Sequence, residues 1–277
     1  MSVMPFGDKS LDLSLPHVMG ILNVTPDSFS DGGSFNSLDN ALQQTEKMLQ
    51  EGASLIDVGG ESTRPGASPV STQQELDRVL PVIEAIKKRF DTIVSVDTST
   101  AEVIRGAAAL GAGLINDVRA LEREGALLAA SETELPICLM HMQGNPESMQ
   151  NSPSYQSVVD DVSGYLLSRV AVCEKLGIAK SRLLLDVGIG FGKSLEHNLT
   201  LINQMGRFKE LGFHLLTGVS RKTMIGDVLN LPVSDRLFGT MGANASAYKS
   251  GSRLFRVHDV KPHVEMLALM SRIEREI

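Results

Sequence analysis

The sequence is poor in cysteine, and it lacks both a long apolar run and an excess of cationic residues. Its only cysteines, Cys138 and Cys173, lie in strand-like and helix-like runs, so we expect buried thiols and not a disulfide framework. No apolar run approaches the roughly 20 residues of a membrane span, and the first residues lack the apolar core of a signal peptide. The net charge of −7 argues against a nucleic-acid partner. These absences predict a cytoplasmic protein in which any anionic ligand is met by local cations.

Metal-binding motifs are equally scarce. The sequence has no H-E-x-x-H motif and no cluster of cysteine and histidine, which argues against a structural or catalytic zinc ion. Magnesium differs, because it uses few carboxylates and takes phosphate oxygens and water as its other ligands. We therefore keep open a magnesium ion beside a pyrophosphate, with Asn23 and Asp31 as the candidate ligands.

The length of 277 residues suits one α/β barrel, which typically needs about 250 residues, or two ordinary domains. No linker rich in proline, glycine or serine divides the chain. The hydrophobic content of 42% and charged content of 21% are ordinary for a globular protein with a sizeable core. We predict a single domain over residues 1–277, in which residues 1–16 form a lead-in to the first strand.

Eight apolar, β-prone runs recur along the chain, and each ends on a polar or charged residue. The runs are HVMGILNV, SLIDVGG, TIVSVDT, GLINDV, PICLMH, RLLLDVG, HLLTGVS and RLFRVHD. Their polar ends are Asn23, Asp57, Asp97, Asn116, His141, Asp186, Ser220 and the pair Arg256 and His258. Buried strands that each deliver a polar group at the C-terminal end are how a (β/α)8 barrel builds an active site. We predict this α/β fold, the TIM barrel, with a doubly wound open sheet as the alternative.

Helical segments alternate with the runs. The clearest covers residues 155–176, where apolar residues recur at intervals of three and four. Thr72 with Glu75, and Ser99 with Glu102, predict capping boxes at the starts of two further helices. Short glycine turns precede several runs, whereas the turns after the runs are long and polar. This asymmetry is typical of a barrel with one working face.

The glycine-rich segment GIGFGKS invites comparison with phosphate-binding loops. A P-loop needs G-x-x-x-x-G-K-[ST], but its first glycine would fall on Val187. The dinucleotide pattern G-x-G-x-x-G also fails, because the third glycine comes one residue early. We interpret the glycines as a tight turn between a strand and a helix, with Asp186 just before them as a candidate ligand group.

Asp97, Asn116 and Asp186 each end a strand-like run. Any one of them could equally cap the following helix. Three at one barrel mouth would offer acceptors and an amide donor to a flat heterocycle rich in N–H groups. A carboxylate that accepts two parallel N–H bonds from such a ring repeats its pairing with arginine. The three residues therefore predict a heterocycle site.

Cationic groups gather near the last run. Arg256 and His258 are two residues apart and so share one face of a strand. In a closed barrel the last strand pairs with the first, which carries Asn23, so these three side chains would form an anion site. Lys222 would lie between this site and the heterocycle site. The alternative is that Arg256 pairs with Asp259 or with another carboxylate.

Taken in order, these segments resemble the dihydropteroate synthase family of folate synthesis. The matching segments are ILNVTPDSFSDGG, DVGGESTRPGA, SVDT, IND, HMQGNP, GFGK, SRK and RVHDV, spread over residues 17–260. The resemblance implies a barrel, usually a homodimer, that condenses 7,8-dihydropterin-6-ylmethyl diphosphate with 4-aminobenzoate. The products would be 7,8-dihydropteroate and pyrophosphate, with magnesium at the diphosphate. It also implies a transferase of the kind that sulfonamides target.

The resemblance further implies a role for individual residues. The pterin ring would contact Asp97, Asn116, Asp186 and Lys222, with Met140 packed on it. The diphosphate would bind Asn23, Arg256 and His258, with Asn23 beside the magnesium ion. The 4-aminobenzoate site would be bordered by Thr63, Arg64, Lys222 and Thr223. The residues closest to the chemistry would be Asp31, which steadies a cationic intermediate, with Asp97, Lys222 and Arg256.

The chemistry of these groups suits a dissociative substitution. Cations and magnesium would stabilise the departing pyrophosphate, and carboxylates would stabilise the cationic pterin methylene. The loops TPDSFSDGG and ESTRPGASPVS are plain connections or a lid; a closed lid would exclude water.

Three positions depart from the family pattern: Val187 replaces a proline, Ile189 an aromatic residue and Thr223 a serine. Loss of the proline is expected to loosen Asp186. Two alternatives stay open, namely a pterin-dependent methyltransferase domain and a non-catalytic pterin-binding paralogue. Retention of ESTRPG, SRK and RVHD argues against the first, whereas Val187 and Ile189 lend slight weight to the second.

Overall fold

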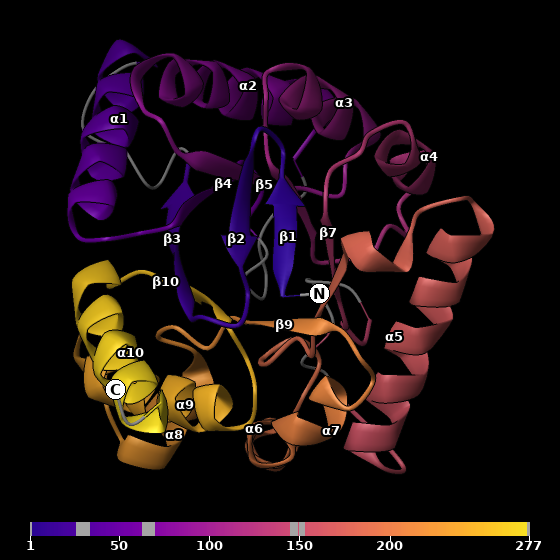
Figure 1. Ribbon diagram of the computed structural model, residues 1–277, viewed down its shortest axis with the longest axis vertical. Coiled ribbons are helices and arrows are strands. Elements are labelled where there is room, and N and C mark those ends of the chain that lie inside the picture. Colours follow the sequence, from indigo (N-terminus) through magenta and orange to yellow (C-terminus); the bar gives the residue numbers. More distant parts are fainter. Residues whose placement is uncertain (1, 26–33, 63–69, 145–148, 150–152, 276–277) are drawn as a thin grey trace.

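Eight parallel strands close into a barrel in the computed structural model, which describes residues 2–25, 34–62, 70–144, 149 and 153–275. The strands are β3 (His17–Asn23), β4 (Leu55–Gly59), β5 (Ile93–Asp97), β6 (Leu114–Asp117), β7 (Ile137–Met140), β8 (Leu183–Asp186), β9 (His214–Thr217) and β10 (Leu254–Val257). Each lies within one of the eight predicted runs. The (β/α)8 barrel is therefore confirmed, and the open sheet is wrong, because β10 pairs with β3 and closes the sheet (Figure 1).

Helices surround the barrel. They are α1 (Ser34–Gln50), α2 (Thr72–Arg89), α3 (Ala101–Ala109), α4 (Ala126–Ser131), α5 (Val158–Lys175), α6 (Leu195–Asn203), α7 (Met205–Lys209), α8 (Thr223–Leu229), α9 (Leu237–Lys249) and α10 (Val260–Arg275). Short 3-10 turns, η2 (Lys180–Arg182) and η3 (Val233–Asp235), complete the described elements. The helix predicted over 155–176 is confirmed as α5.

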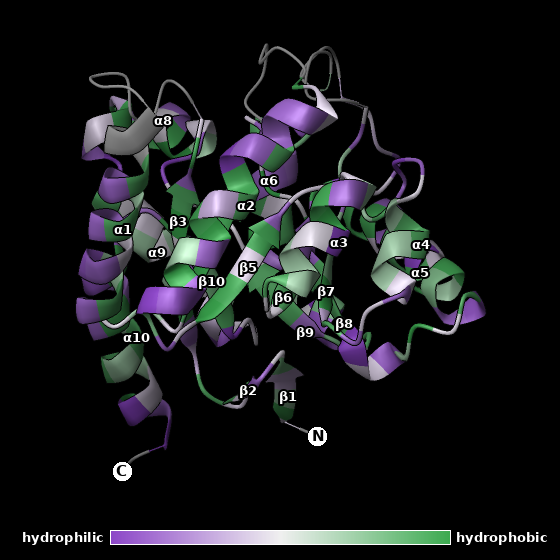
Figure 2. Cartoon of the chain, turned by 90° about the horizontal axis from the view of Figure 1, so that it is seen from above, coloured by the Kyte–Doolittle hydropathy of each residue, from purple (hydrophilic) through white to green (hydrophobic). Residues whose placement is uncertain are grey.

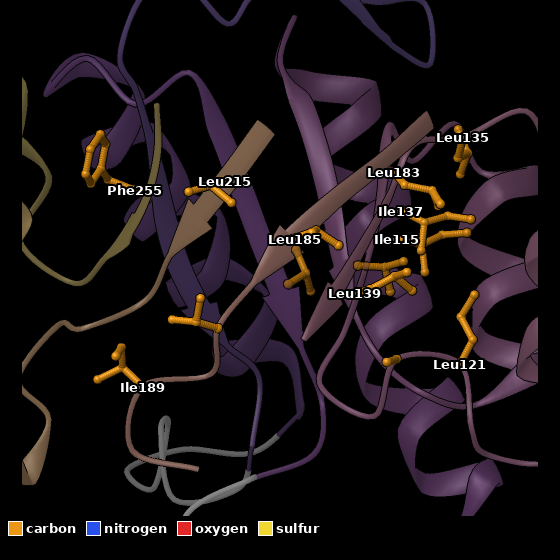
Figure 3. Packing of buried hydrophobic residues seen from close by; sticks show 14 of the residues in the cluster. Ile115, Leu121, Leu135, Ile137, Leu139, Leu183, Leu185, Ile189, Leu215 and Phe255 are labelled. Carbon is orange, nitrogen blue, oxygen red and sulfur yellow. The ribbon is translucent and has the colours of Figure 1, made fainter. Parts of the chain in front are cut away.

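The main hydrophobic core lies between the strands and the helices. Outward-facing side chains of the strands, such as Ile115, Leu139, Leu185 and Phe255, are fully buried against the helical layer (Figure 3). Strands that are buried on both faces read as near-continuous apolar runs, which is why the runs were visible in the sequence. Both cysteines are buried free thiols, as predicted.

Inside the barrel, one apolar residue from each strand forms a ring at the N-terminal end, which we call the lower layer. Its members are Met19, Leu55, Ile93, Leu114, Cys138, Leu184, Leu216 and Leu254. All eight are nearly inaccessible to solvent. This layer is a packed plug, so the barrel is not a pore.

The chain before the first barrel strand forms a hairpin, which the sequence analysis treated only as a lead-in. β1 (Val3–Phe6) pairs antiparallel with β2 (Lys9–Asp12). Phe6 is fully buried, and with Met4 and Leu13 it packs on the lower layer. The hairpin covers the N-terminal end of the barrel, and Figure 2 shows it at the opposite end of the molecule from α8. The lead-in is thus part of the core.

Both predicted capping boxes are wrong in detail. At α2 the cap is Ser71 with Gln74, one residue earlier than predicted, whereas Glu75 is buried and accepts a hydrogen bond from Thr98 Oγ1 at 2.5 Å. The shift leaves Glu75 on the buried face of the helix. At α3 the cap position is Thr100, without a side-chain capping bond. Ser99 instead donates to the carboxylate of Asp117.

Candidate active site at the C-terminal end of the barrel

Two residues beyond the lower layer, five of the eight inward-facing positions are polar. We call this ring the upper layer; its members are Ile21, Asp57, Ser95, Asn116, Met140, Asp186, Gly218 and Arg256. Side chains two apart in a strand share a face, so both layers point to the barrel interior. A wall of apolar side chains thus ends abruptly in carboxylates, an amide and a guanidinium, at the end where such barrels hold their sites.

Asp57 is the central acceptor of the upper layer. Its side chain is fully buried and accepts hydrogen bonds from Ser95 Oγ at 2.5 Å, Asn116 Nδ2 at 3.2 Å and Arg256 Nε at 2.5 Å. Arg256 also donates from Nη2 to Asp97 Oδ2 at 2.7 Å. One guanidinium therefore joins two carboxylates across the barrel, and a fully buried carboxylate is stabilised by charge-assisted hydrogen bonds.

The acidity of Asp97 is strongly changed by its surroundings. Burial raises its pKa to about 7, since desolvation outweighs the attraction of the Arg256 guanidinium, and the nearby charge of Asp57 adds to the rise. The carboxyl group of Asp97 therefore changes its charge near neutral pH. Groups tuned in this way gather at functional sites.

Asp186 ends β8 and leads into the glycine turn. Burial raises the pKa of its carboxyl group, while the positive charge of Lys222 opposes the rise. The backbone N–H of Gly188 donates to Asp186 Oδ1 at 2.8 Å. Val187 and Ile189 are buried in the main core. The carboxylate is thus held by the turn itself although the expected proline is missing.

The interpretation of GIGFGKS as a tight turn is confirmed. Gly188, Gly190 and Gly192 have φ angles of 68°, 82° and 64°, in the left-handed region that favours glycine. A β-carbon on Gly188 would lie 1.8 Å from the carbonyl oxygen of His141, so only glycine fits there. The turn connects β8 to α6, whose capping box is formed by Ser194 and His197.

Lys222 is the N-cap residue of α8, and its side chain reaches into the mouth of the barrel. Its Nζ donates to the carbonyl of Ile189 and lies 4.4 Å from the centre of the Phe191 ring. Burial lowers its pKa to about 8, and Asp186 opposes that change. Thr223, the next residue, is exposed.

The predicted anion group is only partly assembled. Arg256 lies on the heterocycle side, bound to Asp57 and Asp97. The alternative of an arginine–carboxylate pair thus holds in this structure, although Asp259 is not the partner; Asp259 pairs with Arg221, whose Nε lies 2.9 Å from Oδ2. The role of Arg256 toward a diphosphate stays a prediction.

His258 and Asn23 lie near the seam between the first and last barrel strands. His258 Nδ1 is 2.9 Å from Ser220 Oγ, so Ser220 fixes the orientation of the ring. Asn23 ends β3 and is half-buried. It lines a hollow of about 500 Å³ together with polar residues of α1, namely Asn40, Gln43, Gln44 and Lys47.

Of the four remaining candidate residues, one lies within the part of the chain that the structure describes. Met140 ends β7 beside Asp186 on β8 and is almost fully buried, in a place to pack on a ring bound at the mouth. Asp31, Thr63 and Arg64 lie outside the described residues.

Two residues of the site were not assigned roles from the sequence. The sequence analysis identified Asp57 only as the polar end of a run. Asp57 and Arg256 both occupy inward-facing positions of their strands, and this shared direction could have predicted their pairing. Lys193 lies directly after the glycine turn and is 3% exposed, with its Nζ 2.9 Å from His141 Nδ1. A lysine at the start of a helix gave no sign of such burial.

Two wider features bear on the kind of site. Over the described ranges, no helix is long and apolar enough to cross a membrane. Over the same ranges, no three side chains of histidine, cysteine, aspartate or glutamate gather as ligands for a metal ion.

Comparison with known proteins agrees with this geometry. The profile of the pterin binding enzyme family matches residues 19–258. The dihydropteroate synthase of Escherichia coli K12 is 55% identical over 261 residues, which are 94% of this chain and 93% of that protein. The dihydropteroate synthase of Haemophilus influenzae is 52% identical, and the match covers 94% of each chain.

Solved structures agree in fold as well. The Yersinia pestis dihydropteroate synthase in a sulfonamide drug complex is similar with a TM-score of 0.94 and 50% identity, over 99% of both chains. The Xanthomonas albilineans dihydropteroate synthase with 4-aminobenzoic acid is similar with a TM-score of 0.93 and 43% identity, over 99% of this chain and 98% of that one. The chain therefore belongs to the pterin binding enzyme family, and within it to the dihydropteroate synthases that its motifs resemble.

Proposed function

We propose that this protein condenses 7,8-dihydropterin-6-ylmethyl diphosphate with 4-aminobenzoate, releasing pyrophosphate and 7,8-dihydropteroate. The observation that carries the proposal is the upper layer, where buried carboxylates and an amide lie beside an arginine and a lysine at one barrel mouth. The Escherichia coli and Xanthomonas relatives support the same reaction, since both are dihydropteroate synthases. A pterin-dependent methyltransferase is not favoured, and neither is a non-catalytic paralogue.

The pterin ring would bind on the side of Asp186 and Asn116. The Asp186 carboxylate is held by one backbone N–H and keeps acceptor capacity for the N–H groups of the ring edge. The Asn116 amide donates to Asp57, and its oxygen would accept from the ring. Met140 would pack on the ring face.

The diphosphate would bind on the other side of the mouth. Arg256 lies on the heterocycle side in the free protein, and its guanidinium would turn from Asp97 toward the phosphate oxygens while its Nε stays bound to Asp57. His258 would donate from the ring nitrogen that does not face Ser220. The charge that builds on the departing pyrophosphate is stabilised by these donors.

A magnesium ion would fit at Asn23. Asn23 ends β3 and lines a polar hollow, and magnesium commonly takes one or two protein ligands with phosphate oxygens and water. When bound, the ion would supply charge neutralisation at the diphosphate. Asp31 would be its second protein ligand or steady the pterin cation, and Thr63 and Arg64 would border the 4-aminobenzoate site with Lys222 and Thr223.

The test is pyrophosphate release from the pterin diphosphate with magnesium present. We expect release that depends on added 4-aminobenzoate. Release into water without 4-aminobenzoate would contradict a synthase, and no release at all would favour a binding paralogue. Transfer of a methyl group would favour the methyltransferase reading.

We further propose that the protein works as a homodimer in the cytoplasm. Consecutive segments at α8, η3 and α9 expose apolar side chains, led by Phe238 at 82% exposure, with Val228, Leu229 and Val233. Such a cluster is unusual on a monomer. Phe238→Asp should shift the sedimentation coefficient from dimer to monomer, whereas Val3→Asp, at the exposed hairpin, should not. The buried free thiols suit a reducing compartment.

A further inference from the structure

Lys193 is a buried lysine behind the glycine turn for which the proposed reaction has no use. Its Nζ lies 2.9 Å from His141 Nδ1, 2.9 Å from the Phe191 carbonyl and 3.4 Å from the His141 carbonyl. Three acceptors match the three protons of an ammonium group. No carboxylate forms an ion pair with Lys193 within the described part of the chain. Burial and the nearby charge of Lys222 lower the pKa of Lys193 well below its usual value, and Asp186 opposes the change, so a positive charge held at this place costs free energy and calls for a purpose.

The same turn contacts two groups of the proposed substrate site, Asp186 and Lys222. The Gly188 N–H donates to Asp186, and the Ile189 carbonyl accepts from Lys222. The Phe191 carbonyl accepts from Lys193. The two lysines therefore bind carbonyls two residues apart in one short turn, Lys222 within the mouth and Lys193 within the protein interior.

Close packing ties the turn to the end of β7. The backbone N–H of His141 donates to the Asp186 carbonyl at 3.0 Å. Gly188 approaches the His141 carbonyl, and Gly192 approaches the Gln143 carbonyl, so closely that a β-carbon on either would clash. The Lys193 ammonium bridges this junction, since it binds His141 on one side and Phe191 on the other. A shift of its head group would therefore move the backbone that carries the Asp186 carboxylate.

We infer that Lys193 is a positioning residue for the pterin site, whose Nζ hydrogen bonds lock the turn from Val187 to Phe191 and keep the neighbouring Asp186 carboxylate aimed at the ligand. This inference rests on the proposed function only in taking Asp186 as a pterin ligand. Lys193 itself does not touch the ligand and acts through the turn.

The charges around Asp186 set the expected pH dependence. Lys222 lowers the pKa of Asp186 most among the neighbouring cations, followed by Lys193 and Arg256, against the rise that burial causes. His141 is neutral in the working range, because burial and Lys193 lower its pKa to about 3. Burial raises the pKa of the Tyr155 and Tyr165 hydroxyls, which keeps both neutral. The other titratable groups packed here are His197 against Tyr155, and Cys138, whose pKa burial raises.

The test is calorimetric binding of 6-hydroxymethylpterin, without diphosphate, across the acidic and neutral range. Lys193→Gln keeps N–H donors for the Phe191 carbonyl and removes the charge; Lys193→Met removes both. We expect pterin affinity to fall about tenfold at neutral pH in both variants, and the acidic midpoint of binding to move upward by about one pH unit, because an adjacent cation lowers a carboxyl pKa by about that much or more. If Lys193→Met does not fold, Lys193→Gln alone decides.

Lys180→Met is the matched control. Lys180 is a lysine of the same β8 unit, with its Nζ 4.6 Å from the centre of the Phe213 ring, but it lies before β8 at the other end of the strand. Its pterin binding curve should match that of the unmodified protein.

An unchanged acidic midpoint in Lys193→Gln, even with weaker binding or a lower melting temperature, would overturn the inference, because a purely structural role moves stability and not the midpoint. Failure of the unmodified protein to bind the pterin would instead count against the proposed function.

Discussion

The lower and upper layers of the barrel interior lie two residues apart on the same strands, yet they have opposite roles. The lower layer is apolar on all eight strands and is sealed by Phe6 of the hairpin. The upper layer buries Asp57, Asn116 and Asp186 together with Arg256. Burial of apolar groups stabilises the fold, whereas burial of charges costs free energy even when they are paired. One layer therefore holds the barrel together, and the other holds charges ready for a ligand.

This contrast explains where pKa values change. Lower-layer positions have no titratable group other than Cys138, whose thiol burial keeps neutral. In the upper part of the barrel, burial raises the pKa of Asp97 to about 7 and lowers that of Lys222 to about 8. In the free protein, burial disfavours the charged forms of these two groups. A ligand that brings N–H donors and phosphate oxygens would stabilise the charged forms, and this stabilisation would contribute to the free energy of binding.

The largest expected effects come from substituting one residue of each layer on β8. Leu184→Asn places an unpaired amide in the lower layer and should lower the free energy of unfolding by about 3 kcal/mol. Asp186→Asn should change it by less than about 1 kcal/mol, while kcat/KM for the pterin diphosphate falls on the order of 100-fold, because a charged acceptor is lost. Urea denaturation and steady-state kinetics measure both. Equal loss of stability in the two variants would contradict the division into layers.

The next largest effect concerns Arg256, which belongs to the network of the free protein and, in our proposal, to the diphosphate site. Arg256→Ala leaves Asp57 and Asp97 without their cation and should cost about 3 kcal/mol of stability. It should also weaken binding of the pterin diphosphate more than binding of the bare pterin. Titration calorimetry with both ligands separates the roles: equal loss for both would remove Arg256 from the diphosphate site.

The pH profile sharpens the contrast further. Asp97 gains its proton as the pH falls through about 7, and Lys222 loses its proton as the pH rises through about 8. The value of kcat/KM, which reports the free enzyme, should therefore rise through the first pKa and fall through the second. Lys222→Arg should move the alkaline limb upward, since a guanidinium stays charged, and Asp97→Asn should remove the acidic limb. If neither variant changed the pH profile, the ionisation of Asp97 and Lys222 would not control catalysis.

The sequence predicted the barrel because its strands are buried on both faces and end in polar residues. It could not show the hairpin plug, since KSLD and VMPF have no strong strand pattern and are stabilised by the lower layer. Arg256 was expected at an anion site, but it faces the barrel interior, where its guanidinium donates to Asp57 and Asp97. Burial of Lys193 and the cap at Ser71 depend on tertiary packing, which overrides local preference.

The smallest predicted effect tests the corrected helix start. Ser71 caps α2 through its side chain, whereas Thr72 is the first residue within the helix. Ser71→Ala should lower the free energy of unfolding by about 1 kcal/mol. Thr72→Ala should change the free energy of unfolding by less than about 0.5 kcal/mol. Thermal unfolding of the two variants decides between the positions, and a larger effect at Thr72 would restore the original prediction.

The central claim is that the upper layer is a pterin site, and a crystal structure with bound 6-hydroxymethylpterin tests it most directly. The account predicts the ring at the C-terminal mouth, with its N–H edge on the Asp186 carboxylate, Asn116 beside it and Met140 on its face. A pterin bound elsewhere, or one that leaves Asp186 without a ligand hydrogen bond, would contradict it.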